Sequence, residues 1–326
     1  MRSTNKKQGC VWGSGVLALV VLALATIIPS VSAEENEHAK TKHVDCDRGE
    51  TVTRILSSVD PGDTILINGT CNENLLFSSP TGRYDGVTLD GQGAATLSGP
   101  DSTLNVIEVT GVSRFTIRGL TITGGHDGLS INTGNNIAID NVVVENTGRH
   151  GIHFQRGTTM AFVVNSTIQN NPQNGIVINE NSYVRVGFTD GIGASEGDTG
   201  PCMIQGNGGY GIRIQRASSA RIYTNTISNN ASNGINIESA SYAELATNVI
   251  SGNGKNGVAV TENSTLHLGN PAGNKNEDRP NTTTAPNVGF GLSASWGSYV
   301  VGRMGTLMGS GGASNFTHAA NNNLTP

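Results

Sequence analysis

A four-residue unit, glycine followed by an apolar, a variable and a second apolar residue, recurs six times in the middle of this chain. Its six copies are Gly128-Leu129-Ser130-Ile131, Gly151-Ile152-His153-Phe154, Gly175-Ile176-Val177-Ile178, Gly211-Ile212-Arg213-Ile214, Gly234-Ile235-Asn236-Ile237 and Gly257-Val258-Ala259-Val260. The glycines are separated by 23, 24, 36, 23 and 23 residues. A repeat of this length predicts a solenoid, in which each unit buries its apolar face by stacking on its neighbours.

Each repeat contains three short segments in which apolar and polar residues alternate, the period-2 pattern of half-buried strands. The second segment follows the glycine unit, as in Ala220–Ile222, and a third follows an Asn or Ser, as in Thr226-Ile227. Turns rich in Asn, Gly and Ser separate the three segments. The predicted fold class is therefore all-β, a right-handed parallel β-helix with coils of about 23 residues.

Two other solenoids have comparable repeats but fit less well. A leucine-rich repeat needs a leucine framework and a helical segment, whereas this core is built from Ile and Val. A left-handed hexapeptide helix needs coils in multiples of six residues, which a spacing of 23 does not satisfy. Asn170-Asn171, Asn229-Asn230 and Gly252-Asn253 fall at matching points of their coils. We therefore expect an asparagine ladder, with amides hydrogen-bonded along the stack.

The repeat and its flanks divide the chain into four segments. We interpret them as a signal peptide at 1–33, an extension at 34–49, the β-helix at 50–268 and an irregular C-terminal coil, cap and tail at 269–326. The first segment has basic residues, an apolar run too short to span a bilayer as a helix, and small residues at the cleavage point.

Two features interrupt the regular coils. Glu50 to Val59 has the apolar spacing of a short amphipathic helix, which we expect to cap the N-terminal end of the core. The 36-residue interval contains a Gly-rich, acidic insertion at roughly Thr189–Pro201, which we expect to project from one coil.

Cleavage after residue 33 would leave 17 of the 20 Lys and Arg residues against 25 Asp and Glu, so the mature chain would be acidic. Nucleic acids need many cationic contacts, and anionic membranes attract basic runs. We therefore expect neither as a partner of the mature chain, which the leader would place in a secreted or periplasmic location.

Three cysteines would remain after cleavage, and an exported chain can form disulfides. We expect Cys46 to pair with Cys71, which closes a short loop where the fold begins. This pairing leaves Cys202 as an odd thiol. A buried, unreactive Cys202 is favoured over a reactive one, because structural thiols are usually inert.

Asp60-Pro61-Gly62-Asp63-Thr64, Leu89-Asp90-Gly91-Gln92-Gly93 and the Asn-Gly-Ile/Val units resemble the parallel β-helix repeat proteins of the pectate-lyase-like superfold. The resemblance covers roughly residues 45–268 and is greatest to exported bacterial members without an assigned activity. It implies a binding face along one sheet, which other members use as polysaccharide lyases, glycoside hydrolases or epimerases. Adhesins and phage tail spikes share the scaffold, so the fold alone assigns no reaction.

The catalytic motifs of those enzymes are absent or partial in this chain. The acidic strand of polygalacturonases becomes Asn132-Thr133-Gly134, and the Asp-Pro-His-Asp of alginate epimerases is reduced to His126-Asp127. No cluster of Ca²⁺-binding carboxylates beside an arginine stands out, as pectate lyases would need. The sequence therefore identifies no metal site, and it leaves any other cofactor unassigned.

The repeat register nevertheless predicts which side chains share the outward face of the glycine-unit strands. Residues at equivalent positions form three rows: Glu108, Ser130, His153, Val177, Arg213, Asn236 and Ala259; Asn105, Asp127, His150, Asn174, Tyr210, Asn233 and Asn256; and Thr110, Asn132, Gln155, Asn179, Gln215, Glu238 and Thr261. In these rows Asp127 and His150 would be neighbours across one coil, where a carboxylate could orient an imidazole and raise its basicity.

This arrangement suggests roles for nine residues. His150 or His153 would be the general acid or base, with Asp127 as its partner and Arg213 as the group that neutralises a uronate carboxylate. Arg149, Arg156, Gln215, Arg216 and Glu238 would bind substrate.

The sequence leaves three functions open. The first is binding, with lyase or epimerase modification, of an acidic polysaccharide; hydrolysis is weaker, since only Asp127 with Glu108 or Glu238 could pair. The others are a carbohydrate-binding module without turnover and a structural, adhesin-like surface protein. Aromatic residues make up only 5% of the chain, which argues against neutral, cellulose-like ligands. The oligomeric state is not predicted.

Overall fold

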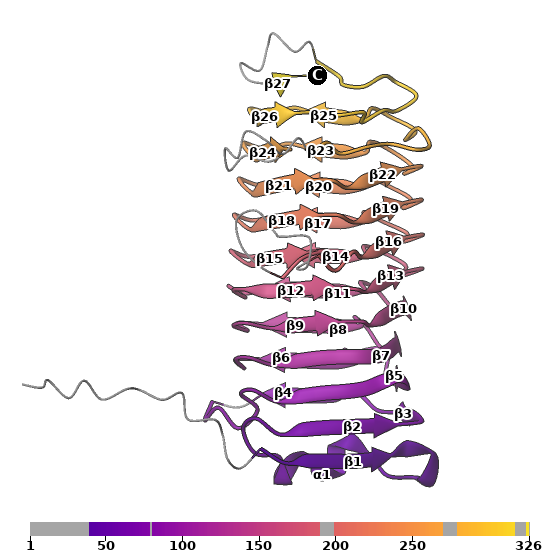
Figure 1. The fold of residues 1–326 in the computed structure, drawn as a ribbon, viewed down its shortest axis with the longest axis vertical. Coiled ribbons are helices and arrows are strands. Elements are labelled where there is room, and N and C mark those ends of the chain that lie inside the picture. The colour runs from indigo at the N-terminus through magenta and orange to yellow at the C-terminus, as the bar shows by residue number, and fades with distance from the viewer. Residues whose placement is uncertain (1–38, 79, 190–198, 270–278, 317–323, 326) are drawn as a thin grey trace, which may run out of the picture. The chain divides into compact units, whose positions relative to one another are not determined.

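In the computed structural model, residues 39–78, 80–189, 199–269, 279–316 and 324–325 are described, and they fold as a stack of parallel coils (Figure 1). Every inter-strand ladder among them is parallel, and neighbours are one coil apart in sequence. The predicted right-handed parallel β-helix is thus confirmed. None of the described helices is long and apolar enough to cross a membrane.

The glycine units form one nine-stranded sheet, here called sheet 1. Its strands are β4 (Leu75–Ser78), β6 (Ile107–Thr110), β8 (Leu129–Asn132), β11 (Ile152–Gln155), β14 (Ile176–Ile178), β17 (Ile212–Ile214), β20 (Ile235–Ile237), β23 (Val258–Val260) and β25 (Leu292–Ala294).

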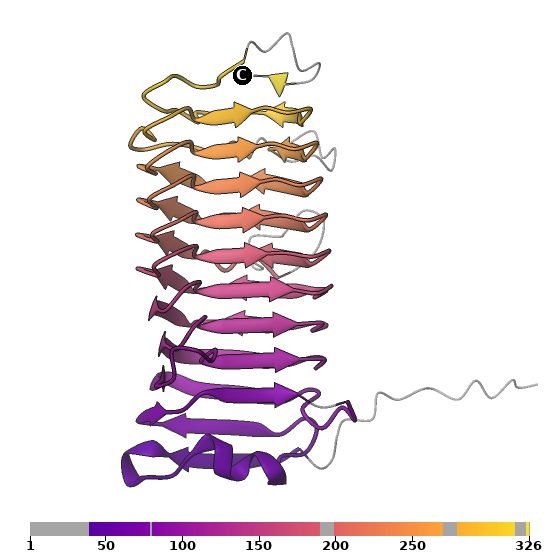
Figure 2. The same ribbon diagram turned by 180° about the vertical axis from the view of Figure 1, so that it is seen from behind.

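The strands that follow sheet 1 in each coil form two further columns. Sheet 2 contains β1 (Thr41–Asp45), β2 (Thr64–Asn68), β9 (Ala138–Asp140), β12 (Ala161–Val164), β15 (Tyr183–Val186), β18 (Ser219–Tyr223), β21 (Tyr242–Ala246), β24 (Thr265–Leu268), β26 (Tyr299–Arg303) and β27 (Leu324–Thr325). Sheet 3 contains β3 (Thr70–Asn72), β10 (Val143–Thr147), β13 (Thr167–Gln169), β16 (Met203–Gln205), β19 (Thr226–Ser228) and β22 (Val249–Ser251). The long strands β5 (Thr88–Gly99) and β7 (Thr116–Gly124) run through both columns. Figure 2 shows the same stack from behind.

The predicted asparagine ladder is present at the corner between sheet 3 and sheet 1. Asn171, Asn207, Asn230, Asn253 and Asn287 are buried, and the side-chain amide of each of the first four donates to the next carbonyl oxygen at 2.9–3.0 Å. The backbone N–H of each of these four donates to that same oxygen. Each buried polar group at this corner therefore has a partner, which removes the cost of burying it.

The glycine at the start of the repeat unit is required by this ladder. A Cβ at Gly234 would lie 2.7 Å from the amide nitrogen of Asn253 and 2.7 Å from the carbonyl oxygen of Gly257. At Gly211 the same contacts would measure 2.8 Å and 2.6 Å. Only glycine permits so close an approach between coils, since real side chains do not reach such distances.

A second ladder runs through the corner between sheet 2 and sheet 3, and Cys202 lies at its start. Asn225, Asn248 and Asn281 bond to one another there, and the backbone N–H of Cys202 donates to Asn225 Oδ1 at 3.0 Å. The thiol donates to the carbonyl oxygen of Val163 at 3.3 Å, and burial raises its pKa to about 12. Cys202 is free and buried, as expected, and a thiol that stays protonated is a poor nucleophile.

The N-terminal end is capped as predicted, although by a shorter helix. An α-helical turn, α1 (Val52–Ile55), and a 3₁₀ turn, Leu56–Ser58, lie at this end of the stack (Figure 1). The Glu73 carboxylate accepts hydrogen bonds from the N–H groups of Val52 and Thr53 at 2.7 and 2.8 Å, so it satisfies donors that a helix start leaves open. Cys46 is joined to Cys71 by a disulfide.

Both predicted boundaries of the β-helix need correction. Residues 41–45, assigned to the extension, form β1 and pair in register with β2, because Val44 alternates into the core there. At the other end, β25 and β26 continue sheets 1 and 2 where an irregular coil was expected. The predicted signal peptide and most of the insertion, residues 190–198, lie outside the described residues.

The ladder predicts a large stability cost for one buried amide. In Asn230→Ala, the N–H and side-chain amide of Asn207 both lose their acceptor inside the core. Each such loss costs about 1–3 kcal/mol, so we expect the free energy of unfolding to fall by roughly 2–4 kcal/mol. The matched control is Asn72→Ala at an exposed strand position. Equal denaturant midpoints for the two variants would contradict the ladder's role.

Candidate functional site

The outward face of sheet 1 has the register that the sequence predicts. Ser130 pairs with His153, His153 with Val177, Val177 with Arg213, and Arg213 with Asn236. Equivalent side chains are therefore one strand spacing apart, about 4.8 Å per coil. The predicted residues occupy one face, but they divide into separate groups along it.

Asp127, Arg149 and His153 form the first group; His153 is on β11, and the other two lie in the turns before β8 and β11. Asp127 is 1% exposed, and its Oδ1 accepts a hydrogen bond from Arg149 Nε at 2.8 Å. His153 Nδ1 lies 3.4 Å from Asp127 Oδ2 and 3.3 Å from Arg149 Nη2. Burial alone would raise the pKa of Asp127, but Arg149 and His153 together hold it well below its usual range.

His150 lies one coil from Asp127, as expected, yet the predicted carboxylate–imidazole pair between them is wrong. Asp127 Oδ1 accepts a hydrogen bond from the backbone N–H of His150 at 3.1 Å, not from its ring. The ring Nδ1 instead accepts the backbone N–H of Asn174 at 3.3 Å. Burial lowers the pKa of His150 to about 3, the opposite of the predicted increase in basicity. The carboxylate's imidazole partner is His153.

The contacts of Asp127 and His150 belong to a ladder that the sequence did not reveal. In the row before each glycine, side chains accept the backbone N–H of the next coil: Asn105 from Asp127, Asn174 from Tyr210, Asn233 from Asn256, and Asn256 from Phe290. With Asp127 and His150 the row has six such acceptors, of which four are Asn, and that recurrence of Asn at one repeat position was the available signal. Asp127 and His150 therefore have a structural role in addition to any chemistry.

Arg213 and Glu238 form the second group, two coils beyond His153. Arg213 Nε donates to Glu238 Oε1 at 2.7 Å, and its guanidinium lies 5.6 Å from the ring centre of Tyr210. Glu238 also accepts a hydrogen bond from Asn236. Two strand spacings separate β11 from β17, about 10 Å. The Arg213 guanidinium is paired with Glu238, one coil further from His153, so the two groups occupy different parts of the face.

The remaining predicted residues lie in or beside the turns after sheet 1. Arg216 pairs with Glu180 at 3.1 Å, a residue that sequence reasoning missed. Arg156 is exposed, in a left-handed conformation, and has no carboxylate partner among the described residues. Gln215 is half-buried beside them. These three residues border the face and are not brought together with the Asp127 group.

Three buried polar atoms on sheet 1 have no hydrogen-bond partner among the described residues. They are Asn132 Oδ1, His153 Nε2 and Asn179 Oδ1, from three consecutive coils, and their residues are 3%, 8% and 4% exposed. Buried polar groups are nearly always satisfied, so such a group calls for a missing partner. Their position marks the coils of β8, β11 and β14 as the part of the face with free hydrogen-bonding capacity.

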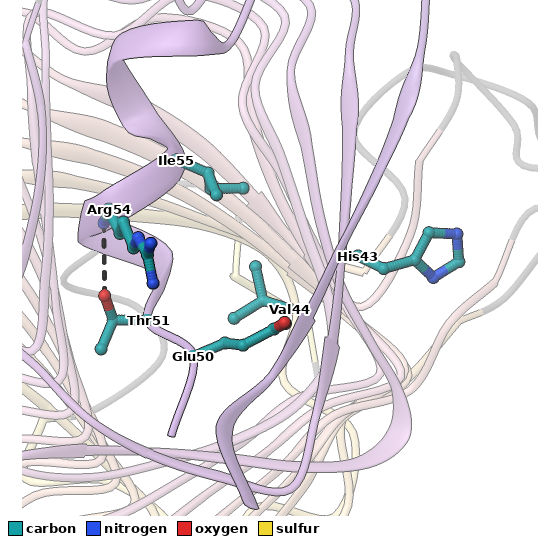
Figure 3. Close-up of a pocket in the computed structure, with 6 residues that line it drawn as sticks. All are labelled: His43, Val44, Glu50, Thr51, Arg54 and Ile55. Atoms are coloured by element: carbon teal, nitrogen blue, oxygen red, sulfur yellow. Dashed lines mark hydrogen bonds between the residues drawn. The ribbon is translucent and has the colours of Figure 1, made fainter. Parts of the chain in front are cut away.

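A cavity of about 260 Å³ lies elsewhere, between β1 and α1 at the N-terminal end. Figure 3 shows Val44, Glu50 and Ile55 around this space, with His43 projecting from the other side of β1. None of the predicted site residues lines it. Among the described residues the group with metal-ligand geometry is Cys46, Cys71 and Glu73, and its two cysteines are already joined as a disulfide.

Comparison with known proteins supports the fold assignment. The family model described as "Right handed beta helix region" matches residues 105–270 and 189–295, together more than half of the chain. The structure of pectate lyase Pel9A is similar, with a TM-score of 0.54, 14% identity and coverage of 80% of this chain and 77% of that chain. For the A-module of the Azotobacter vinelandii mannuronan C-5 epimerase AlgE4 the values are 0.50, 15%, 81% and 91%. No curated protein sequence matches this chain.

The lowered pKa of His150 predicts a pH dependence of stability. Unfolded His150 binds a proton below pH 6.5, whereas folded His150 does so only near pH 3. The contribution of His150 to the free energy of unfolding is thus fully present above pH 6.5 and is lost as the pH falls toward 3. Between these values the contribution of His150 falls by at most about 1.4 kcal/mol per pH unit. In His150→Asn the new side-chain oxygen can accept the same ladder hydrogen bond from the Asn174 N–H, but the side chain binds no proton in this pH range. We expect urea unfolding between pH 6.5 and 4.5 to show a shallower slope for the variant; parallel slopes would refute the assignment.

Proposed function

Because the chain belongs to the family of proteins with a right-handed beta helix region, we propose that it binds an acidic polysaccharide along sheet 1 and removes a proton from it at His153. The proposal includes export to a secreted or periplasmic location through the segment 1–33. Two of the similar solved structures are named as a pectate lyase and a mannuronan C-5 epimerase, and pectate and mannuronan are acidic polysaccharides.

The observation that carries the proposal is the group of three buried polar atoms, in the coils of β8, β11 and β14, that have no hydrogen-bond partner among the described residues. A polysaccharide lying along the stack would supply hydroxyl groups to Asn132, His153 and Asn179, one coil after another. The face is extended and periodic, which suits a polymer better than a small molecule. A ligand reaches His153 Nε2 only by displacing the atoms that now bury it.

Two arginines on the outward face of sheet 1 support the proposal that the ligand is acidic. Arg149 and Arg213 are about one-third exposed, and each is already held in place by a carboxylate, Asp127 or Glu238. A guanidinium can bind a second carboxylate with its remaining donors, because it has five N–H groups in a planar fork. Arg213, two coils from His153, would hold a different sugar unit from the reacting one.

The Asp127 group supports proton removal at a carbon next to a carboxylate. In the proposed step His153 Nε2 takes the C5 proton of a uronate, and the Asp127 carboxylate stabilises the imidazolium that forms. Arg149 neutralises the charge that develops on the sugar carboxylate. His150 is unsuited as the base, because its Nδ1 lone pair accepts the Asn174 N–H and its pKa is about 3.

Loss of the C5 proton leads to either of two products. Departure of the 4-oxygen gives an unsaturated lyase product, and return of a proton to the opposite face gives the epimer. Hydrolysis by Asp127 with Glu238 is not supported, since four coil steps, about 19 Å, separate them, whereas glycosidase carboxylates lie roughly 5 to 9.5 Å apart.

A second candidate is binding without turnover, in a carbohydrate-binding or structural surface protein. The observation in its favour is that two carboxylates of the face are already ion-paired, Asp127 with Arg149 and Glu238 with Arg213. Such saturated pairs also occur where charges only stabilise a surface.

One experiment separates these candidates. Polymannuronate and polygalacturonate are incubated with the protein in D₂O, and the products are examined for unsaturated uronate by ultraviolet absorbance and for deuterium at C5 by mass spectrometry. Proton removal gives deuterium or unsaturation, whichever product forms. We expect His153→Asn to lower this rate by 10²-fold or more, the scale of general acid–base catalysis.

The control is His43→Asn, an exposed histidine on β1 outside the proposed site. It should leave the rate unchanged. Wild-type protein that binds the polymers without exchange or cleavage would establish the binding candidate, and equal rates for the two histidine variants would remove His153 as the base.

A further inference from the structure

A second group of chemistry-bearing residues lies on the outward face of sheet 2, in its C-terminal half. We call Tyr183, Arg185, Arg221, Tyr242, Glu244 and Tyr299 the sheet 2 patch. They come from β15, β18, β21 and β26, and the strand register places them in two adjacent outward rows. This face is separate from sheet 1 and shares none of its predicted site residues.

The fold does not require such residues at these positions. In the row that contains Arg185, Arg221 and Glu244, the earlier coils carry Thr88, Thr116 and Ala138, and large side chains begin at Phe162, one coil before Arg185. Those coils stack equally well, because outward positions need only be solvated. The change to large aromatic and charged side chains therefore calls for a reason other than packing of the core.

Glu244 organises the patch. It is 8% exposed, and its carboxylate accepts hydrogen bonds from the hydroxyls of Tyr242 at 2.6 Å and Tyr223 at 2.9 Å and pairs with Arg221 at 2.8 Å. Burial and the nearby Glu244 charge raise the pKa of both tyrosines, so their hydroxyls remain donors. The Tyr242 ring is thereby held in a fixed position before any ligand arrives, which lowers the entropic cost of binding.

Arg185 adds a cation over aromatic rings. Its guanidinium lies 5.5 Å from the ring centre of Phe162, 5.7 Å from that of Phe188 and 5.9 Å from that of Tyr183. No carboxylate pairs with it among the described residues. With Arg221 and Glu244 the patch has one positive charge in excess, which suits an anionic ligand.

The tyrosines are spaced to suit a polymer. Tyr183, Ser219, Tyr242, Thr265 and Tyr299 follow one another in a single row, so an aromatic ring alternates with a small side chain. Rings in that row are two strand spacings apart, about 10 Å, which is close to the length of a disaccharide unit. Tyr299 is 42% exposed, and Trp296, 73% exposed, lies in the turn before it.

A buried ring nitrogen without a hydrogen-bond partner among the described residues lies beside Tyr242 of the sheet 2 patch. His267 faces Tyr242 edge to face, with ring centres 5.3 Å apart, and its Nδ1 is buried without a hydrogen-bond partner among the described residues. Glu244 is its neighbour across one coil. A hydroxyl of a bound ligand would satisfy this nitrogen.

We propose that the sheet 2 patch is a second binding site, for an extended anionic glycan whose sugar rings stack on Tyr183, Tyr242 and Tyr299 and whose acidic group pairs with Arg185. Flat apolar faces of pyranose rings pack on aromatic side chains, and the alternating small residues leave room for them. This site would act independently of the one on sheet 1.

The test is isothermal titration of the full chain with hexagalacturonate, and with cellohexaose as the uncharged hexamer. We expect hexagalacturonate to bind, and Tyr299→Ala and Arg185→Gln each to weaken it about tenfold, or about 1.4 kcal/mol. Thr116→Ala, in the same row where the coils carry small residues, should leave the affinity unchanged. Tyr299 is exposed, so its variant is expected to fold, and thermal unfolding verifies this.

Arg213→Ala separates this site from sheet 1. Binding that persists in Arg213→Ala but weakens in Tyr299→Ala supports the sheet 2 site whether or not sheet 1 proves active. The proposal is overturned if hexagalacturonate does not bind, if Tyr299→Ala and Arg185→Gln bind as the wild type does, or if cellohexaose binds equally well.

Discussion

The hydrogen-bonded ladder of Asn171, Asn207, Asn230, Asn253 and Asn287 is the interaction on which the other features depend. It requires one Asn per coil at one corner and a glycine close by, since a Cβ at Gly211 or Gly234 would collide with the ladder. Because each amide bonds to the next coil, the ladder fixes the coils in a single register. The same register determines which outward side chains are neighbours in each row, and therefore which residues can form a site together.

This dependence explains what the sequence could predict. Corner glycines and asparagines recur visibly, so the fold, the ladder and the rows of sheet 1 followed from spacing alone. The pairing of Asp127 with His153 rather than His150 did not, because both histidines lie within reach and side-chain direction decides between them. The sheet 2 patch was missed because Tyr183, Tyr242 and Tyr299 are far apart in sequence and aromatic residues are scarce overall. The C-terminal coil was misjudged because the repeat spacing is lost after Leu268 although the pairing continues.

The residues before each glycine show that an ionisable side chain can take the place of Asn in this fold without loss of the ladder hydrogen bond. Most coils use Asn there as an acceptor for the next backbone N–H, and Asp127 and His150 make the same hydrogen bond. The two substitutions therefore preserve the ladder while they add a carboxylate and an imidazole. Their surroundings set the charge of each: Arg149 and His153 hold Asp127 ionised, and burial holds His150 neutral. His150 is thus a member of the ladder, whereas His153, one row away, has a buried ring nitrogen without a hydrogen-bond partner among the described residues.

Both candidate faces have the repeat period of the stack, and this restricts the shape of a ligand. Unsatisfied atoms on sheet 1 come from three successive coils, and the tyrosines of sheet 2 come from every second coil. A compact molecule would contact one or two coils and leave the other positions unused. A linear polymer along the axis meets equivalent groups at each step, so that many weak contacts add up without a deep pocket. A parallel β-helix with outward polar and aromatic rows is therefore suited to long glycans by its geometry, before any catalytic residue is considered.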